Sequence, residues 1–233
     1  MSAIVAEPIT IAVGSDTRVS GLLQVPPDAR AGYAVAHGAG AGMNHPFMIA
    51  VAAELAQRGI ATLRYQFPYM ERGSRRPDPP ELAHATVRAA VAAAQLALPA
   101  LPLIAGGKSF GGRMTSQAQA KAALPGVRGV AFLGFPLHPA GKPSQDRAKH
   151  LFEVKIPMLF LQGTRDTLAA LDQLEPVCAA LGKRATLKLF EAADHSFHVP
   201  ARSGRTDAQV RAEMLDTLTA WIDAVIKAPR PAR

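Results

Sequence analysis

The sequence is poor in cysteine, because Cys178 is the only one among 233 residues. A single cysteine cannot form an intrachain disulfide, and it excludes a zinc cluster built on several thiolates. The seven histidines are scattered without the spacing of metal ligands. We therefore expect neither a metal nor a cofactor. Cys178 lies in an apolar segment with helical spacing, where a cysteine usually packs as a small apolar side chain.

Long apolar runs are also lacking, and no segment approaches the length of a membrane span. The opening segment, MSAIVAEPIT, has neither a basic start nor an extended apolar core, so it is unlike a secretory signal. These absences predict no membrane partner and, by default, a cytoplasmic location.

Charged residues make up only 19% of the chain, and the net charge is +8. Such an excess of positive charge can indicate binding to nucleic acid, to an anionic membrane or to an acidic ligand. Here the basic residues are scattered, and the densest group is Arg72, Arg75 and Arg76 in a proline-containing loop. Because the sequence has no basic helix and no alternation of basic with aromatic residues, we expect no nucleic-acid partner.

What the chain does contain is a regular alternation of β-like and helical segments. The expected strands are residues 9–13, 19–25, 32–36, 60–65, 101–105, 129–133, 157–161 and 185–189, with the first two forming a hairpin. The expected helices are residues 46–58, 81–98, 109–123 and 168–181, and a final helix opens with a capping box of Thr206 and Gln209. This alternation predicts an α/β fold with a mostly parallel central sheet and helices on both faces. The length suits a single domain, residues 1–233, with 228–233 as a frayed end.

The most informative segment is LPLIAGGKSFGGRM, residues 101–114. An apolar strand runs into Gly107-Lys108-Ser109-Phe110-Gly111 and a helix follows, which is the G-x-S-x-G pattern in a strand–turn–helix context. Such a turn holds the serine above the sheet edge at a helix N-terminus, which favours developing negative charge. We predict that Ser109 is a nucleophile; a glycine-rich turn without chemistry is the alternative. A phosphate-binding loop would require a glycine where Pro102 stands.

A serine nucleophile needs a base, and the base needs an acid that orients it. Asp166 follows the strand at 157–161, and His195 follows the strand at 185–189, so the chain order is Ser, Asp, His. We predict Ser109, Asp166 and His195 as a catalytic triad. His198 is the alternative base, and Asp194 is expected to stabilise the loop because it is badly placed to face the neighbouring imidazole.

A loop of small residues, His37-Gly38-Ala39-Gly40-Ala41-Gly42, follows the strand at 32–36. Small residues let backbone N–H groups approach a substrate oxygen, so this loop is the expected oxyanion hole. The predicted donors are the N–H groups of Phe110 and Ala39, with Gly40 as second choice for the latter. We expect His37 to hold the shape of the loop.

Five segments together resemble the α/β-hydrolase superfamily, and most closely its small dienelactone-hydrolase-like branch: HGAGAG, RYQFPY, GKSFGG, QGTRD and ADHSF. The resemblance covers nearly the whole chain. It implies a sheet of about eight strands and hydrolysis of carboxyl esters or related acyl compounds. It also assigns the triad roles to Ser109, Asp166 and His195 and the oxyanion roles to Ala39 and Phe110. Dienelactone hydrolases proper use a cysteine nucleophile, so their substrate is not carried over to this serine-containing chain.

The substrate is predicted only as a small acyl compound. The connection 134–156 is short, with room for one small helix near 147–152, so we expect a minimal lid and an open site. The candidate pocket residues are His37, Gly40, Phe67, Tyr69, Lys108 and Leu137. Met70 and Phe110 are further candidate walls, and ordinary packing would equally explain the apolar and aromatic ones. Lys108 and the loop 72–76 are candidates for attracting an anionic substrate. The competing function is a catalytically silent interaction module on a hydrolase fold. The sequence does not determine the oligomeric state.

Overall fold

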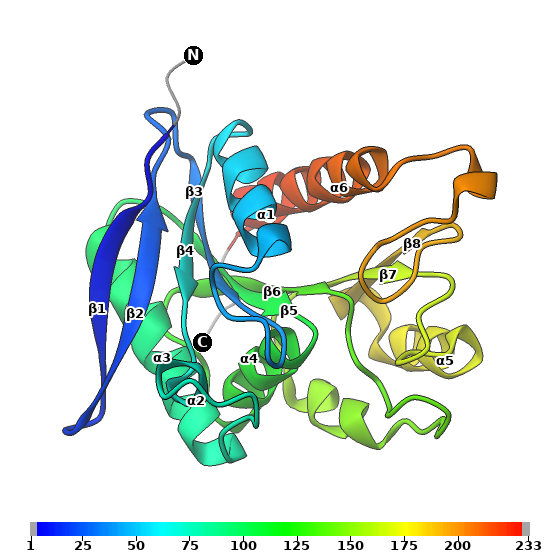
Figure 1. The fold of residues 1–233 in the computed structure, drawn as a ribbon, viewed down its shortest axis with the longest axis horizontal. Coiled ribbons are helices and arrows are strands. Elements are labelled where there is room, and N and C mark those ends of the chain that lie inside the picture. The colour runs from blue at the N-terminus through cyan, green and yellow to red at the C-terminus, as the bar shows by residue number, and fades with distance from the viewer. Residues whose placement is uncertain (1–3, 230–233) are drawn as a thin grey trace.

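An eight-stranded sheet forms the centre of the molecule, in the order β1-β2-β4-β3-β5-β6-β7-β8 (Figure 1). The structure is a computed structural model that describes residues 4–229. The first three strands in this order pair antiparallel and all later neighbours pair parallel, which confirms the expected mostly parallel sheet. The strands are β1 (Glu7–Val13), β2 (Thr17–Gln24), β3 (Ala31–Ala36), β4 (Ile60–Tyr65), β5 (Leu103–Lys108), β6 (Val127–Leu133), β7 (Met158–Gly163) and β8 (Ala185–Phe190).

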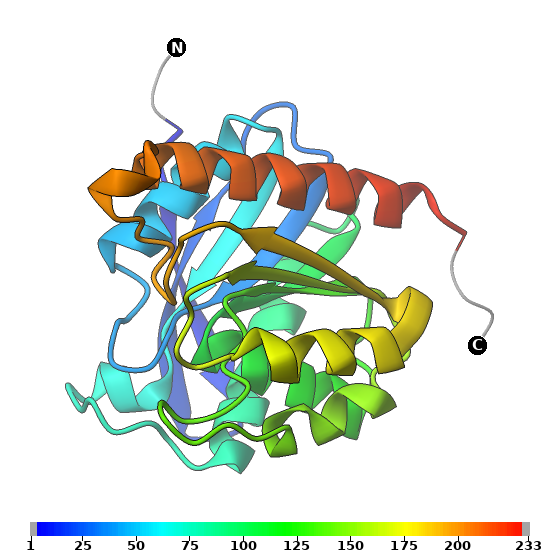
Figure 2. The same cartoon turned by 90° about the vertical axis from the view of Figure 1, so that its right-hand side faces the viewer.

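Helices cover both faces of the sheet, as Figures 1 and 2 show. The α-helices are α1 (Pro46–Ala56), α2 (Pro68–Glu71), α3 (Pro80–Ala97), α4 (Phe110–Lys121), α5 (Leu171–Leu181) and α6 (Asp207–Lys227). Three 3-10 helices are η1 (Asp146–Glu153), η2 (Gly182–Arg184) and η3 (Ala201–Ser203). One buried cluster joins α1 and α6 to one face of the sheet. Two others join α3, α4, α5 and η1 to the opposite face, so the core lies in two layers.

The buried strands explain why the sheet carries helices on both sides. All six residues of β3, of β4 and of β7 are buried, so neither face of these strands meets solvent. Because β3 to β8 run parallel, their carboxyl ends lie at one edge of the sheet. The loops after β3, β5, β7 and β8 therefore meet there, and they carry the predicted triad and oxyanion residues.

Several boundaries differ from those expected. The strand β5 continues to Lys108 instead of ending at residue 105, because Gly106 and Gly107, with φ of 154° and 153°, stay paired with β3 and β6. The helix α5 begins at Leu171 instead of 168. The short helix α2 was not expected; Pro68 at its first turn favours it. The capping box that opens α6 is confirmed.

The connection between β6 and β7 contains η1 as its helical element, which confirms the expected minimal lid. The helix α6 ends at Lys227 and Ala228 leaves the helical conformation; residues 230–233 of the expected frayed end lie outside the described part of the chain. Within residues 4–229, no helix is both long and apolar enough to cross a membrane.

Candidate active site

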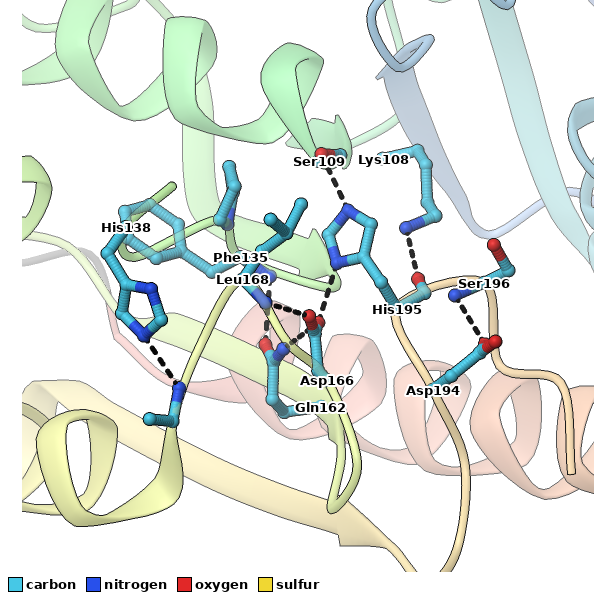
Figure 3. A network of polar contacts seen from close by, with 12 residues as sticks. Lys108, Ser109, Phe135, His138, Gln162, Asp166, Leu168, Asp194, His195 and Ser196 are labelled. Atoms are coloured by element: carbon cyan, nitrogen blue, oxygen red, sulfur yellow. Dashed lines mark hydrogen bonds and ion pairs between the residues drawn. The ribbon is translucent and has the colours of Figure 1, made fainter. Parts of the chain in front are cut away.

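Ser109 occupies a strained turn between β5 and α4. Its φ of 49° and ψ of −117° place a non-glycine residue at positive φ, a conformation that costs on the order of 1–3 kcal/mol and that clusters at functional sites. Its N–H donates to the carbonyl of Leu133 on the neighbouring strand (3.3 Å). The turn directs the serine side chain away from the sheet, at the N-terminus of α4 (Figure 3).

The two glycines of the motif make the turn possible. A Cβ atom on Gly107 would lie 2.2 Å from the carbonyl oxygen of Ala36, and one on Gly111 would lie 2.5 Å from that of His37. Both distances are far below van der Waals contact, and both atoms belong to the backbone, which cannot move aside cheaply. Any other residue at either position would separate β5 or α4 from β3.

Three side chains from separate loops form a continuous hydrogen-bonded chain (Figure 3). His195 Nε2 lies 2.8 Å from Ser109 Oγ, and His195 Nδ1 lies 2.6 Å from Asp166 Oδ2. Because the carboxylate accepts from Nδ1–H, Nε2 is left as the acceptor for the serine hydroxyl. The side chain of Asp166 is fully buried, whereas that of His195 is 21% exposed and reaches the surface.

Asp166 is held by two further donors. Its Oδ1 accepts from the N–H of Leu168 (2.8 Å), and its Oδ2 also contacts Nε2 of Gln162. Gln162 is buried at the end of β7, and its Oε1 accepts from the N–H of Phe135 (2.9 Å), so it links the acid to the end of β6. Sequence reasoning missed this residue; a polar side chain in an otherwise apolar strand was the available signal.

The loop that carries His195 is fixed from two directions. Asp194 accepts from the N–H groups of Ser196 (2.7 Å) and His198 (3.0 Å), which is the loop-stabilising role expected for it. From the other side, the Nζ of Lys108 donates to the carbonyl of His195 (2.6 Å). Burial lowers the pKa of Lys108 to about 8, against the opposing effect of the nearby Asp166 and Asp194 carboxylates.

His198, the alternative base, lies outside this chain of hydrogen bonds. Its Nδ1 pairs with Asp207 at the start of α6 (2.9 Å), and its side chain is 63% exposed. This ion pair raises the pKa of His198 and ties the loop after β8 to the last helix. The hydroxyl of Ser109 therefore meets His195 and not His198.

The loop after β3 presents backbone N–H groups beside Ser109. Within residues 4–229, no protein acceptor takes the N–H of Ala39 or that of Phe110, the first residue of α4. The N–H of Gly40, the second choice as donor, is already bonded to the hydroxyl of Tyr69 (3.1 Å). The free donors are thus the two that the sequence predicted for an oxyanion hole.

His37 connects this loop to the segment after β4. Its Nδ1 lies 2.7 Å from the carbonyl of Gly38, and its Nε2 accepts from the N–H of Phe67 (3.1 Å). Burial lowers the pKa of His37 to about 4, so the imidazole is neutral near pH 7 and can accept and donate at once. This arrangement matches the shape-holding role expected of it.

Two clefts meet at Ser109 and share Ala39, Ser109 and Leu168 in their walls. The first, the histidine cleft, has a volume of about 410 Å³ and is also lined by Phe47, Met48, Lys108, His195 and Ser196. The second, the arginine cleft, has a volume of about 480 Å³ and is also lined by Asp78, Phe110, Arg113, Met114 and Arg147. Ser109 is therefore accessible from both sides.

The structure corrects the expected pocket lining. Of the expected pocket residues, Lys108 and Phe110 line a cleft. Six others line neither cleft: His37, Gly40, Phe67, Tyr69, Met70 and Leu137. Four of these six are fully buried, namely His37, Phe67, Tyr69 and Leu137. Phe67 packs edge-on against Phe110 at a centroid distance of 5.3 Å, so the aromatic residues support the site from behind. In the densest basic loop, Arg72 pairs with Asp78 (2.6 Å).

The chain belongs to the α/β-hydrolase family, because residues 29–223 match the family described as an alpha/beta hydrolase domain. This match confirms the resemblance read from the sequence motifs.

Within residues 4–229, no group of three or more His, Cys, Asp or Glu side chains is arranged to hold a metal ion.

Solved structures with the same fold cover almost the whole chain. A dienelactone hydrolase from Anabaena variabilis is 21% identical, with a TM-score of 0.78 over 96% of this chain and 99% of that one. A serine hydrolase without a lid from Xanthomonas campestris is 20% identical, with a TM-score of 0.72 over 97% of both chains. The esterase domain of a Rhodothermus marinus protein is 18% identical, with a TM-score of 0.72 over 95% and 99%. At these identities the likeness establishes the fold.

Proposed function

We propose that this protein is a serine hydrolase that cleaves carboxyl esters of small acids through an acyl-enzyme on Ser109. The observation that carries the proposal is the unbroken sequence of hydrogen bonds from Ser109 Oγ through His195 to the buried Asp166. A serine is a weak nucleophile by itself, and an adjacent base held in the correct tautomer is what activates it.

In the first step, Ser109 Oγ attacks the ester carbonyl while His195 Nε2 takes the hydroxyl proton. The imidazolium that forms is stabilised by Asp166, which keeps its own negative charge. The carbonyl oxygen becomes an oxyanion and accepts from the N–H groups of Ala39 and Phe110. Such preorganised donors are typically worth about 10²–10³ in rate each.

The tetrahedral intermediate then collapses. His195 returns its proton to the leaving oxygen, the carbon–oxygen bond to the alcohol breaks, and the acyl group stays on Ser109. A water molecule, deprotonated by the same imidazole, attacks the acyl carbonyl and releases the carboxylic acid, which restores the serine hydroxyl.

The short connection between β6 and β7 leaves the clefts open, which suits small acyl groups. We place the enzyme in the cytoplasm, where a chain without disulfides is at no disadvantage.

A fluorophosphonate probe tests the proposal, because it phosphonylates only an activated serine. We expect the wild-type protein to be labelled and Ser109→Ala not to be. Turnover of short-chain aryl esters by that variant should fall by at least about a thousandfold.

Ser116→Ala is the matched control. Ser116 Oγ also faces an imidazole, His150 Nε2, at 2.7 Å, but it lies within α4 and is fully buried. This variant should retain labelling and turnover. If folded wild-type protein is neither labelled nor active, the proposal fails and an interaction module on the hydrolase fold becomes the better explanation.

A further inference from the structure

The arginine cleft contains two positive charges next to Ser109. Arg113 lies on α4, four residues after Ser109, and Arg147 lies on η1 in the connection between β6 and β7. Both side chains line the cleft that Ser109 and Phe110 also line. Four residues along an α-helix correspond to a rise of about 6 Å, so Arg113 belongs to the immediate surroundings of the reacting centre.

Neither guanidinium has a carboxylate partner among residues 4–229. Arg113 Nε is buried without any hydrogen-bond acceptor, and Arg147 makes one long contact, 3.5 Å from Nη1 to the carbonyl of Pro136. Burial and the neighbouring Arg147 lower the pKa of Arg113. Two like charges facing one cleft destabilise the unoccupied protein, and a buried donor without an acceptor adds to that cost.

Asp78, which shares the cleft wall, does not compensate these charges. One of its carboxylate oxygens accepts from Arg72 (2.6 Å) and the other from the N–H of Tyr69 (2.8 Å). Both oxygens thus have partners that hold the segment before α3. The positive charge of the arginine cleft remains available to a ligand.

The position of His195 decides which part of an ester enters which cleft. The imidazole must deliver its proton to the leaving oxygen, so the alcohol portion leaves on the side where His195 lies. His195 and Ser196 line the histidine cleft and not the arginine cleft. The acyl portion, on the opposite side of Ser109, therefore extends toward Arg113 and Arg147.

We propose that Arg113 and Arg147 bind a carboxylate at the far end of the acyl group, which makes monoesters of short dicarboxylic acids the preferred substrate class. This inference rests on the proposed function and specifies its substrate. The guanidinium group suits the role because its planar fork donates two parallel hydrogen bonds to a carboxylate. The chemistry at Ser109 is unchanged: the ester bond breaks, the alcohol leaves, and water releases the free dicarboxylate.

The test compares esters that differ only in the terminal group. Monoethyl succinate, glutarate and adipate are set against ethyl esters of unsubstituted acids with the same number of acyl carbons, and hydrolysis is followed by pH-stat. We expect wild-type kcat/KM to be at least about 30-fold higher for the best monoester than for its neutral counterpart. The preference should lie mainly in KM, and it should shrink as salt screens the charges.

Arg113→Gln and Arg147→Gln should each reduce that preference to less than about threefold. Lys183→Gln is the control for net charge. Lys183 is exposed in η2, just before β8, so it lies at the amino ends of the parallel strands, whereas the active-site loops follow their carboxyl ends. It should keep the full preference. Since Arg113 is partly buried, a wild-type measurement accompanies the variants: glutarate should slow fluorophosphonate labelling of Ser109, and the neutral diamide glutaramide should do so far less.

The outcomes separate the two proposals. If Ser109 is labelled and neutral esters are hydrolysed, but monoesters show no advantage and glutarate gives no protection, the carboxylate site is wrong and the hydrolase remains. An advantage that persists in both arginine variants also overturns the site. If wild-type protein neither reacts with the probe nor hydrolyses any ester, the proposed function fails and the carboxylate site fails with it.

Discussion

The ammonium group of Lys108 holds the main chain of His195, with 2.6 Å between Nζ and the carbonyl oxygen. Lys108 immediately precedes Ser109, the candidate nucleophile, and His195 is the candidate base. The Lys108 side chain therefore connects the turn of the nucleophile with the loop of the base, and catalysis requires these two segments to keep a fixed relative position. The Nζ also lies 5.6 Å from the centre of the ring of Phe197, two residues after His195 in the same loop. Lys108 is therefore a positioning residue, acting through His195.

Lys108→Met tests this role, because methionine fills a similar volume without donating a hydrogen bond. We expect kcat to fall about tenfold as the imidazole loses its fixed position, a typical cost of small misplacement. Stability should be unchanged or higher, because the variant removes a partly buried charge. Steady-state kinetics and thermal unfolding of the same preparations check both points, and a parallel loss of stability and activity would contradict a purely positioning role.

The pH profile distinguishes the hydrogen bond from simple packing. The pKa of Lys108 lies near 8, so the charge-assisted bond to His195 weakens as pH rises through that value. Wild-type kcat/KM should decline above about pH 8, and Lys108→Met should lack this decline while starting from a lower plateau. Profiles of identical shape would show that the Lys108 proton has no influence on the site.

Tyr69 fixes the loop that contains Ala39. Its hydroxyl accepts from the N–H of Gly40 at 3.1 Å, so Tyr69→Phe leaves that loop without this contact. We expect kcat to fall about tenfold with little change in KM, less than the loss from removing an oxyanion donor outright. Tyr33→Phe is the matched control: its hydroxyl donates to the carbonyl of Ala131 at 3.1 Å, within the core. The control should lose about 1 kcal/mol of stability and keep its activity.

Much of the fold and the central three residues of the site could be predicted from the sequence. Apolar runs and helical spacing identified the eight strands and five of the six α-helices found among residues 4–229, because burial on both faces leaves a strong pattern. The glycines around Ser109 were informative because Gly107 and Gly111 leave no room for a Cβ atom. Ser109, Asp166 and His195 each follow a parallel strand, so topology alone brings them to one edge.

The surroundings of the site could not be predicted, because they depend on where side chains point. Phe67 and Tyr69 looked like pocket walls but are fully buried behind Phe110. No sequence pattern singled out Arg113, yet it lines a cleft beside Ser109. Neither helical periodicity nor composition predicts which side chains from separate loops line the same cleft.

Acid stability offers a test that does not depend on turnover. Burial, with the positive Arg113 nearby, lowers the pKa of His150 to about 4, whereas an unfolded histidine titrates near 6.5. Between these values the unfolded chain binds more protons, so the free energy of unfolding must fall as the pH drops through this window. Each such histidine contributes a slope of up to about 1.4 kcal/mol per pH unit.

His150→Gln removes this contribution and can keep the hydrogen bond to Ser116. Denaturant unfolding between pH 7 and pH 4.5 should show a shallower loss of stability for the variant than for the wild-type protein. His37 has a pKa near 4 for the same reason and remains, so some dependence on pH should persist. Equal slopes for variant and wild type would mean that His150 is protonated freely in the folded protein.

The backbone at Ser109 predicts a conflict between activity and stability. At φ 49° and ψ −117°, a Cβ atom is strained, and glycine alone escapes that strain. Ser109→Ala keeps the Cβ and Ser109→Gly removes it, so comparing these two inactive variants isolates the strain from the lost hydroxyl. Relief of about 1–3 kcal/mol, less the 0.5–1 kcal/mol that glycine loses in entropy, leaves about 1 kcal/mol in favour of glycine. Ser109→Gly should therefore unfold about 2–4 °C above Ser109→Ala in calorimetry. A lower melting temperature for the glycine variant would mean that the turn holds serine without strain. The positive φ at Ser109 would then not reduce the free energy of unfolding.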